Sequence, residues 1–312
     1  MYDQVYKRID DNLWKDAGCG SELDYVEQSS WILFLKYLDD LEQNRQDEAE
    51  LDGRDYEPII TKKFRWSTYA VPKKKNGERD LAKALTGDDL LGFVKNKLFP
   101  YLRAFKTSEA SPDTLQYKIG EIFSGVQCKL TSGYVMRDVF DEVDNLRFQS
   151  SEDQHEMSSL YEIRISRMGN AGRNGGEYYT PRPLIRSIIA VLEPKIGERI
   201  YDGACGSAGF LWEAFAYLIK LCKTAKDRET VQKKMLFGKE KKALPFIIGT
   251  MNMILHGVEA PNILLTNTLA ENLANIQPSQ QVDLVLANPP FGSNSERAEI
   301  KENFTIKTGE TA

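Results

Sequence analysis

Apolar residues in the first half of the chain recur at the spacing of an α-helix. In the stretch 25–51 the apolar positions fall every three or four residues, at Trp31, Phe34, Leu35, Leu38 and Leu41. This spacing predicts a long helix with one buried face and a solvated acidic end, and Asp52 and Gly53 predict its break. Helical periodicity returns in the stretches 90–105 and 135–148.

A basic run, Lys73–Gly77, combines three lysines with an Asn-Gly turn signal. Short charge runs usually face water, so this one predicts a solvated loop rather than a DNA contact. The sequence contains no internal repeat. We interpret residues 1–165 as an all-helical N-terminal domain.

The segment 167–183, RMGNAGRNGGEYYTPRP, changes character abruptly. Its glycines and asparagines predict a flexible linker or a mobile loop. Near its end, Thr180 is expected to cap a helix that holds Pro181 in its first turn and ends at Glu193.

The remaining part, residues 166–312, alternates between helix and strand patterns. Further helices are predicted at 209–222 and 244–255, and strands at 199–202, 234–238, 262–266 and 282–287. Strands separated by helices of this length are typical of a parallel sheet with right-handed crossovers. This half is therefore expected to be α/β.

The composition fits an ordinary soluble globular protein with two domains. The chain has 312 residues, of which 41% are hydrophobic and 28% charged. No apolar stretch approaches the roughly 18 residues that cross a bilayer, and the N-terminus lacks a signal-peptide core. A cytoplasmic location without membrane attachment is the default expectation. The four cysteines have no paired spacing, which indicates neither a disulfide framework nor a zinc site.

The net charge of −5 argues against a chain that grips nucleic acid along its whole surface. If a nucleic acid is the substrate, we expect another subunit to supply much of the phosphate contact.

A glycine-rich turn, DGACGSAGF at 202–210, follows the first predicted strand of the α/β half. Its glycines permit close approach of a ligand to the backbone, and the following helix offers free N–H groups. The spacing matches neither a P-loop nor the dinucleotide fingerprint, and a purely structural turn fits equally well. Glu240 strengthens the case for a nucleoside site, because a carboxylate after the second strand can bind ribose hydroxyls. Its alternative is a solvated residue among lysines.

The most specific element is Asn288–Phe291, where two prolines end the strand 282–287. The Asn288 side-chain oxygen and the Pro289 carbonyl can accept hydrogen bonds from an exocyclic amine, and Phe291 can stack on a planar ring. Two acceptors draw the amine's lone pair toward the tetrahedral form that attacks an electrophilic methyl group. The alternative is a proline-terminated strand with an incidental asparagine.

Four segments, GEYYTPR, DGACGSAGF, FGKE and NPPFGS, occur in this order. Together they resemble the S-adenosyl-L-methionine-dependent DNA amino-methyltransferases, specifically the modification (M) subunit of type I restriction-modification systems. The segments ILFLKYLDDLE and MNMILHG extend the resemblance over nearly the whole chain.

The resemblance implies a Rossmann-like methyltransferase sheet after a helical N-terminal domain, and it implies functional residues. The implied cofactor-binding residues are Glu177, Tyr178, Tyr179, Thr180, Pro181, Arg182, Asp202, Ala204, Gly206, Ser207, Ala208, Gly209 and Glu240. The implied catalytic residues, which bind the target amine, are Asn288, Pro289, Pro290 and Phe291.

The chain departs from the family pattern at a few positions. Gly203 and Ala208 stand where the family usually has Pro and Gly, and both changes should keep the turn. Asn267 replaces an acid, which could weaken a contact with the cofactor's adenine. The sequence stops after NFTIKTGETA, where family members continue, so we expect an incomplete sheet, a fragment, and little or no activity of this chain by itself.

The function implied by the resemblance is methyl transfer to adenine N6 in duplex DNA, with the base flipped out of the stack. The implied partners are duplex DNA, a specificity subunit, a restriction subunit and a second modification subunit. Asn at the first motif position fits adenine N6 better than cytosine N4. Two alternatives remain open: a glutamine or RNA-amine methyltransferase, and a non-catalytic assembly module.

Overall fold

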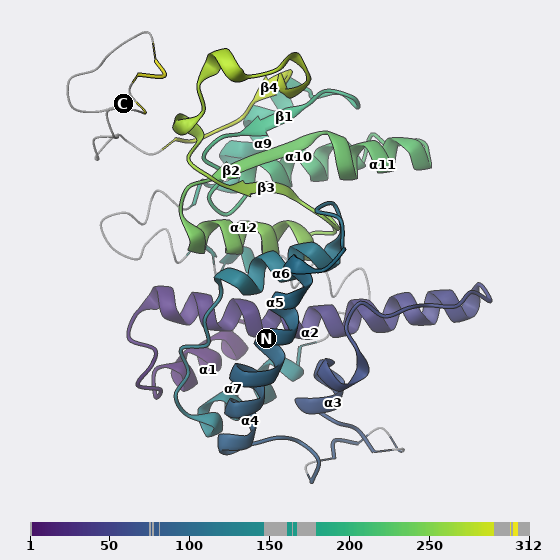
Figure 1. The fold of residues 1–312 in the computed structure, drawn as a ribbon, viewed down its shortest axis with the longest axis vertical. Coiled ribbons are helices and arrows are strands. Elements are labelled where there is room, and N and C mark those ends of the chain that lie inside the picture. Colours follow the sequence, from purple (N-terminus) through teal and green to yellow (C-terminus); the bar gives the residue numbers. More distant parts are fainter. Residues whose placement is uncertain are drawn as a thin grey trace. The chain divides into compact units, whose positions relative to one another are not determined.

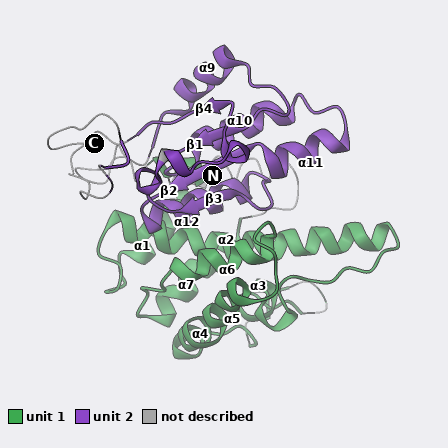
Figure 2. Cartoon of the chain, turned by 45° about the horizontal axis from the view of Figure 1, so that its top comes forward, with its two compact units in different colours: residues 1–171 green, residues 172–312 purple. Residues whose placement is uncertain are grey.

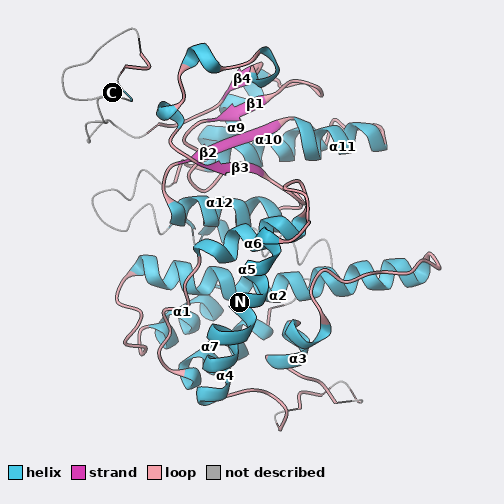
Figure 3. Cartoon of the chain, viewed as in Figure 1, coloured by secondary structure: helices cyan, strands magenta, loops and turns pink. Residues whose placement is uncertain are grey.

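The chain forms two compact units, residues 1–171 and 172–312 (Figure 2). The computed structural model describes residues 2–74, 76, 78–80, 82–146, 161–163, 165–166, 179–289, 300 and 302–304. Within these ranges the first unit is helical apart from one isolated β-bridge, and the second holds helices and a parallel sheet (Figure 3). The predicted fold class, α/β with a helical N-terminal part, is confirmed. The predicted domain boundary after residue 165 stays a prediction.

The first unit is built around one long helix (Figure 1). Its described α-helices are α1 (Tyr2–Leu13), α2 (Glu22–Leu51), α3 (Trp66–Tyr69), α4 (Gly87–Phe93), α5 (Phe99–Ala104), α6 (Leu115–Gly125) and α7 (Gly133–Asp144). The Trp31 ring of α2 meets the rings of Phe99 and Phe140 edge-on, with centroids 5.1 and 6.3 Å away. Helix α2 ends where predicted, with Asp52 as its C-cap.

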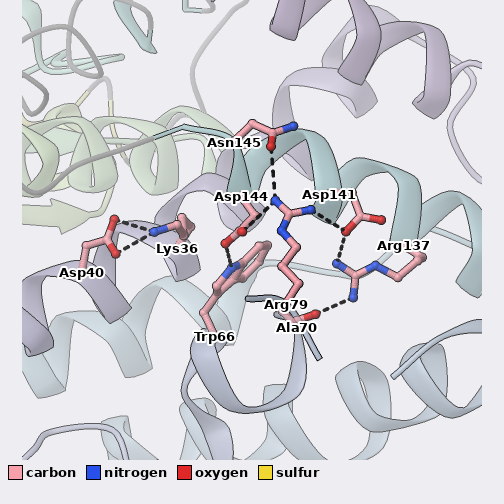
Figure 4. Close-up of polar contacts among 9 residues, drawn as sticks. All are labelled: Lys36, Asp40, Trp66, Ala70, Arg79, Arg137, Asp141, Asp144 and Asn145. Atoms are coloured by element: carbon pink, nitrogen blue, oxygen red, sulfur yellow. Dashed lines mark hydrogen bonds and ion pairs between the residues drawn. The ribbon is translucent and has the colours of Figure 1, made fainter. Parts of the chain in front are cut away.

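The predicted single buried face of α2 is wrong, because the stretch 26–38 is buried on all sides. Some of its polar side chains are satisfied within the helix, and others pair with neighbouring segments, as Gln28 does with the Gln127 carbonyl at 3.0 Å. The Ser30 hydroxyl donates to the Val26 carbonyl at 2.6 Å. The ammonium of Lys36 lies 2.6 Å from both carboxylate oxygens of Asp40 (Figure 4). Internal pairing of this kind lets a helix with charged residues lie in a core.

The other helical predictions hold with local changes. The stretch 90–105 is helical, but a π-helical turn at Val94–Leu98 separates α4 from α5. There the Phe99 N–H donates to the Val94 carbonyl, next to Pro100, which has no N–H to give. The helix predicted at 135–148 ends earlier, at Asp144, with Asn145 as its C-cap.

The basic run forms a turn in the described part of its length. Lys73 pairs with Arg79 in an antiparallel bridge, and the Lys74 N–H donates to the Glu78 carbonyl at 2.8 Å. Lys73 and Lys74 are exposed, so the predicted solvated loop is confirmed for these residues.

Acidic side chains of α7 fasten this loop to the helical unit (Figure 4). Asp144 accepts hydrogen bonds from the Trp66 indole and from Arg79, both at 2.9 Å. Arg137 donates to Asp141 at 2.8 Å and to the Ala70 carbonyl at 2.6 Å. Hydrogen bonds to ionised partners are stronger than neutral ones, so α7 holds the segment 66–79 firmly.

Asp16 joins the connection between α1 and α2 to the start of α7. Its buried carboxylate accepts hydrogen bonds from the Gly18 N–H at 2.8 Å, from the Thr131 hydroxyl at 2.8 Å and from the Ser132 N–H at 2.9 Å. Burial acts to raise the pKa of this carboxyl, but the donated hydrogen bonds outweigh burial and lower it below its usual value.

The second unit holds a parallel sheet of four strands in its described residues. They are β1 (Ile200–Asp202), β2 (Leu236–Glu240), β3 (Asn262–Leu265) and β4 (Leu284–Val285), in the order β3-β2-β1-β4. The register aligns Tyr201 with Phe237 on one side and with Val285 on the other. All four lie within predicted strands or overlap them, and β4 is the most shortened.

Within the described part of the second unit, one α-helix precedes β1, two connect β1 to β2, and one connects β2 to β3 (Figure 1). Those described are α9 (Arg182–Leu192), α10 (Gly209–Ile219), α11 (Ala225–Lys234) and α12 (Ala243–Leu255). Helix α11 was not predicted, because its residues are mostly charged and show no apolar periodicity. Of its ten described residues, only Val231 is buried. Its N-terminus carries a capping box between Thr224 and Asp227, a signal that could have revealed it.

Two predicted helix ends in this unit are wrong. Helix α10 ends at Ile219 and not at Cys222. Thr180 does not cap α9: the N-cap is Pro181, which makes no side-chain cap, and the helix begins at Arg182. The Thr180 hydroxyl is engaged elsewhere, as described below. None of the helices in the described ranges has the length and apolar character of a membrane span.

We predict that Asp16→Ala lowers the free energy of unfolding of the N-terminal unit by about 2–4 kcal/mol at pH 7, because several buried donors lose their acceptor. The folded pKa is lowered, so this contribution is complete above the unfolded pKa of about 4 and shrinks as pH falls below it. Urea unfolding between pH 7 and pH 3 measures both effects. Asp11→Ala, at an exposed position of α1, is the control; an equal loss for the two variants would contradict the assignment.

Candidate functional site

The candidate site lies at the carboxyl ends of three adjacent strands. β1 ends at Asp202, its neighbour β2 ends at Glu240, and Asn288 follows its other neighbour β4. A cleft at this edge is lined in part by these predicted site residues: Thr180, Arg182, Asp202, Ala204, Gly206, Ser207, Gly209 and Asn288. Segments more than 100 residues apart in the sequence therefore meet in one place.

Glu240 ties the glycine-rich loop 202–209 to the end of β2. One of its carboxylate oxygens accepts a hydrogen bond from the Gly206 N–H at 2.9 Å, and the other accepts one from the Lys242 N–H at 2.8 Å. The side chain is half-buried. The alternative of a freely solvated residue is therefore wrong.

Asp202 is a buried carboxyl at the floor of the cleft. Burial raises its pKa to about 7; the Ala204 N–H, which donates to it at 3.1 Å, opposes this rise, and the nearby charge of Glu240 adds to it. Burial also raises the pKa of the neighbouring Cys205 thiol, so the thiol stays neutral near pH 7.

Helix α12 also supports the loop. The Asn252 amide donates to the Ser207 carbonyl at 2.9 Å, and both residues are buried. Gly249 packs so closely that a Cβ at this position would lie 2.6 Å from the Gly206 carbonyl oxygen. Asn252 belongs to the segment MNMILHG, but the local pattern marks neither Asn252 nor Gly249 as a contact of a loop 40 residues away.

A third support comes from the segment after β3. The Thr268 hydroxyl donates to the Gly203 carbonyl at 2.5 Å. Its neighbour Asn267, which stands where the family usually has an acid, accepts a hydrogen bond from the Leu269 N–H at 3.1 Å and so caps a short 3-10 turn. An aspartate could form the same cap, so the replacement preserves the local backbone.

Ala208 keeps the turn at a cost. Its φ is +63°, in the left-handed region, where a residue with a Cβ is strained by roughly 1–2 kcal/mol. The family's glycine would carry no such strain. Alanine at position 208 therefore keeps the turn, as expected, but in a strained backbone conformation.

Arg182 covers the loop. Its guanidinium is buried, donates to the Ser207 hydroxyl and to the Thr180 carbonyl, each at 3.2 Å, and lies 4.8 Å from the centroid of the Tyr179 ring. A Cβ at position 209 would come within 1.6 Å of this guanidinium, so any larger residue there would displace the Arg182 side chain. The cleft beside it is narrow, with an open volume of about 10 Å³.

Asn288 reaches this arrangement from the other side of β1. Its side-chain N–H donates to the Thr180 hydroxyl at 3.2 Å. Pro289 follows as an exposed residue. The remaining predicted residues, Glu177, Tyr178, Pro290 and Phe291, lie outside the described residues.

Comparison with known proteins identifies the family. Residues 152–312 match the model of N-6 DNA methylases, and residues 3–155 match that of the HsdM N-terminal domain. The chain belongs to the N-6 DNA methylase family. Membership in this family of methyltransferases implies a methyl donor as cofactor.

Individual relatives of this chain come from type I restriction enzymes. The EcoEI methylase subunit of Escherichia coli is 36% identical over 99% of this chain and 60% of its own length. A solved structure described as a modification subunit of a type I restriction enzyme from Vibrio vulnificus YJ016 is 38% identical, with a TM-score of 0.85 over 99% of this chain and 64% of that one.

Another solved structure, which concerns assembly and conformational transition of a type I restriction-modification system, is 35% identical, with a TM-score of 0.76 over 99% of this chain and 58% of that one. This chain therefore spans less than two thirds of the length of the relatives that it matches.

We predict that Asp202→Asn raises the free energy of unfolding by roughly 2–4 kcal/mol at pH 8.5 and by a smaller amount, about 1–2 kcal/mol, at pH 5. The folded pKa of about 7 lies above the unfolded value near 4, so the wild-type chain loses stability as pH rises through this window and the neutral asparagine does not. Urea unfolding from pH 5 to pH 9 measures the difference. Glu229→Gln, exposed on α11, is the control; parallel pH profiles for wild type and Asp202→Asn would rule out titration of Asp202.

We also predict that Gly249→Ala destabilises the second unit by about 1–3 kcal/mol, because the added Cβ meets the backbone oxygen of Gly206 and the helix or the loop must shift. Differential scanning calorimetry should record a melting temperature lower by several degrees. Gly20→Ala, where a Cβ meets nothing within 4 Å, is the matched control. An unchanged melting temperature for Gly249→Ala would refute the close contact.

Proposed function

We propose that this chain carries the methyl-transfer site of a type I restriction-modification methylase, which transfers a methyl group from S-adenosyl-L-methionine to adenine N6 in duplex DNA. The observation that carries the proposal is the position of Asn288 at the cleft formed by the glycine-rich loop. A residue able to hold an amine and a loop able to hold a nucleoside cofactor share one site.

The residues present fit such a cofactor in kind. The loop 202–209 supplies backbone N–H groups and glycine-lined space for the methionine part, and Glu240 supplies a carboxylate for the ribose hydroxyls. S-adenosyl-L-methionine supplies an electrophilic methyl group on a sulfonium sulfur. The open volume of about 10 Å³ admits about one water molecule, so the cleft must widen to take the cofactor, and Glu240 exchanges its hydrogen bond with Gly206 for the ribose hydroxyls.

Asn288 and Pro289 act on the target base. The Asn288 side-chain oxygen and the Pro289 carbonyl accept the two N–H hydrogens of adenine N6, which favours the tetrahedral amine with its lone pair directed at the methyl group. The base must leave the duplex to reach this edge of the sheet. The stacking role assigned to Phe291 is part of the proposal and concerns a residue outside the described ranges.

Recognition of a DNA sequence is proposed to lie outside this chain. The net charge of −5 supports a subunit that relies on partners for phosphate contacts. We propose a specificity subunit, a restriction subunit and a second modification subunit as these partners, acting on DNA in the cytoplasm. The relatives named above come from such type I systems.

The alternatives receive less support. A glutamine or RNA-amine methyltransferase would use the same amine chemistry, but the family match is to DNA methylases. A non-catalytic assembly module would not need Asn288 and the glycine-rich loop in one cleft. Calorimetric titration with S-adenosyl-L-methionine distinguishes the non-catalytic module from a methyltransferase, because a vestigial cleft would give no heat of cofactor binding.

We predict that Asn288→Ala in the full-length protein, expressed with its specificity partner, lowers DNA methylation at least 100-fold. The adenine amine then loses the side-chain oxygen that accepts its N–H and favours its tetrahedral, reactive form. Long-read detection of N6-methyladenine in cells measures the loss. Calorimetric titration should give a cofactor affinity within about twofold of wild type. The control is Asn275→Ala, at an exposed position of the same unit. Methylation retained by Asn288→Ala would remove this residue from the mechanism.

A further inference from the structure

The Thr180 side chain forms a hydrogen bond with a residue outside both the glycine-rich loop and α9. Its side-chain oxygen accepts the Asn288 amide N–H at 3.2 Å, across 108 residues of sequence. The sequence analysis gave Thr180 two other roles, a helix cap and a cofactor contact. The first is wrong, since Pro181 is the N-cap of α9. The hydroxyl instead meets the residue that the proposed function assigns to the target amine.

The chemistry of a carboxamide gives this contact a consequence. One end of the Asn288 side chain only donates hydrogen bonds and the other only accepts them. An adenine amine offers N–H donors, so it can be held by the oxygen end and is repelled by the NH₂ end. In the structure the Thr180 oxygen takes up the NH₂ end, so the oxygen end is directed to the remaining side. A hydroxyl can also donate a hydrogen bond, so this contact holds the side chain in place and does not alone choose between its two ends.

Thr180 is itself held in position by the cofactor loop. Its backbone carbonyl accepts a hydrogen bond from one guanidinium nitrogen of Arg182, and the other terminal nitrogen of Arg182 donates to the Ser207 hydroxyl, both at 3.2 Å. Arg182 is buried and Thr180 is half-buried. A continuous path of hydrogen bonds therefore runs from the loop through Arg182 and Thr180 to Asn288.

We infer that Thr180 is a positioning residue that holds the Asn288 side chain in place, with its amide oxygen turned toward the base to be methylated. This inference rests on the proposed function and deepens it, because it separates the role of Thr180 from cofactor binding. A hydrogen bond of this kind shifts the balance between the held and the released side chain by about fivefold to tenfold.

Two substitutions at position 180 test the inference. Thr180→Val keeps nearly the same shape and removes the hydroxyl, whereas Thr180→Ser keeps the hydroxyl and removes a methyl group. In the full-length protein with its specificity partner on duplex DNA, Thr180→Val should lower kcat for methyl transfer about fivefold to tenfold. The Kd for S-adenosyl-L-methionine should change less than twofold, and Thr180→Ser should retain kcat within about twofold of wild type.

The other outcomes overturn the inference. A raised cofactor Kd with unchanged kcat in Thr180→Val would make Thr180 a cofactor contact only, and equal losses of kcat in the valine and serine variants would assign the effect to packing. Unchanged kinetics would also reject the role. Failure of the proposed function itself is distinct, because the wild-type protein would then show no methyl transfer to DNA.

Discussion

The site depends on one constraint, the position of β1 between β2 and β4 in a parallel sheet. Parallel strands end at the same edge, so adjacent strands deliver the residues that follow them to the same place. Asp202, Glu240 and Asn288 come from the ends of these three strands. In a different strand order at least one of these residues would lie further from Asp202, by at least one additional strand spacing of about 4.8 Å.

Around this edge the glycine-rich loop is held from several sides. Glu240 binds it from β2, Asn252 from α12, and Thr268 from the segment after β3. Ala208 adds a strained backbone conformation that these contacts must maintain. The contacts from Asn252 and Thr268 can remain when Glu240 turns to the ribose hydroxyls. The loop backbone therefore loses little conformational freedom on binding, which favours affinity and orientation.

Local patterns predicted much of this molecule, and tertiary contacts account for the rest. The glycine turn, the double proline after Asn288 and the spacing of α2 are local signals, and each led to the right element. Burial of α2 on all sides depends on its neighbours, and α11 has no apolar periodicity to detect. The support from Asn252 depends on packing between α12 and the loop, which no pattern within either segment encodes.

The most direct test of the account is a structure of this chain with S-adenosyl-L-homocysteine, the product form of the cofactor. The account predicts that the ligand lies in the cleft of the loop 202–209. Glu240 should turn from the Gly206 N–H to the ribose hydroxyls. The Asn288 side-chain oxygen should lie next to the ligand's sulfur and face solvent, where the base would enter. A ligand bound elsewhere, or a sulfur remote from Asn288, would contradict the account.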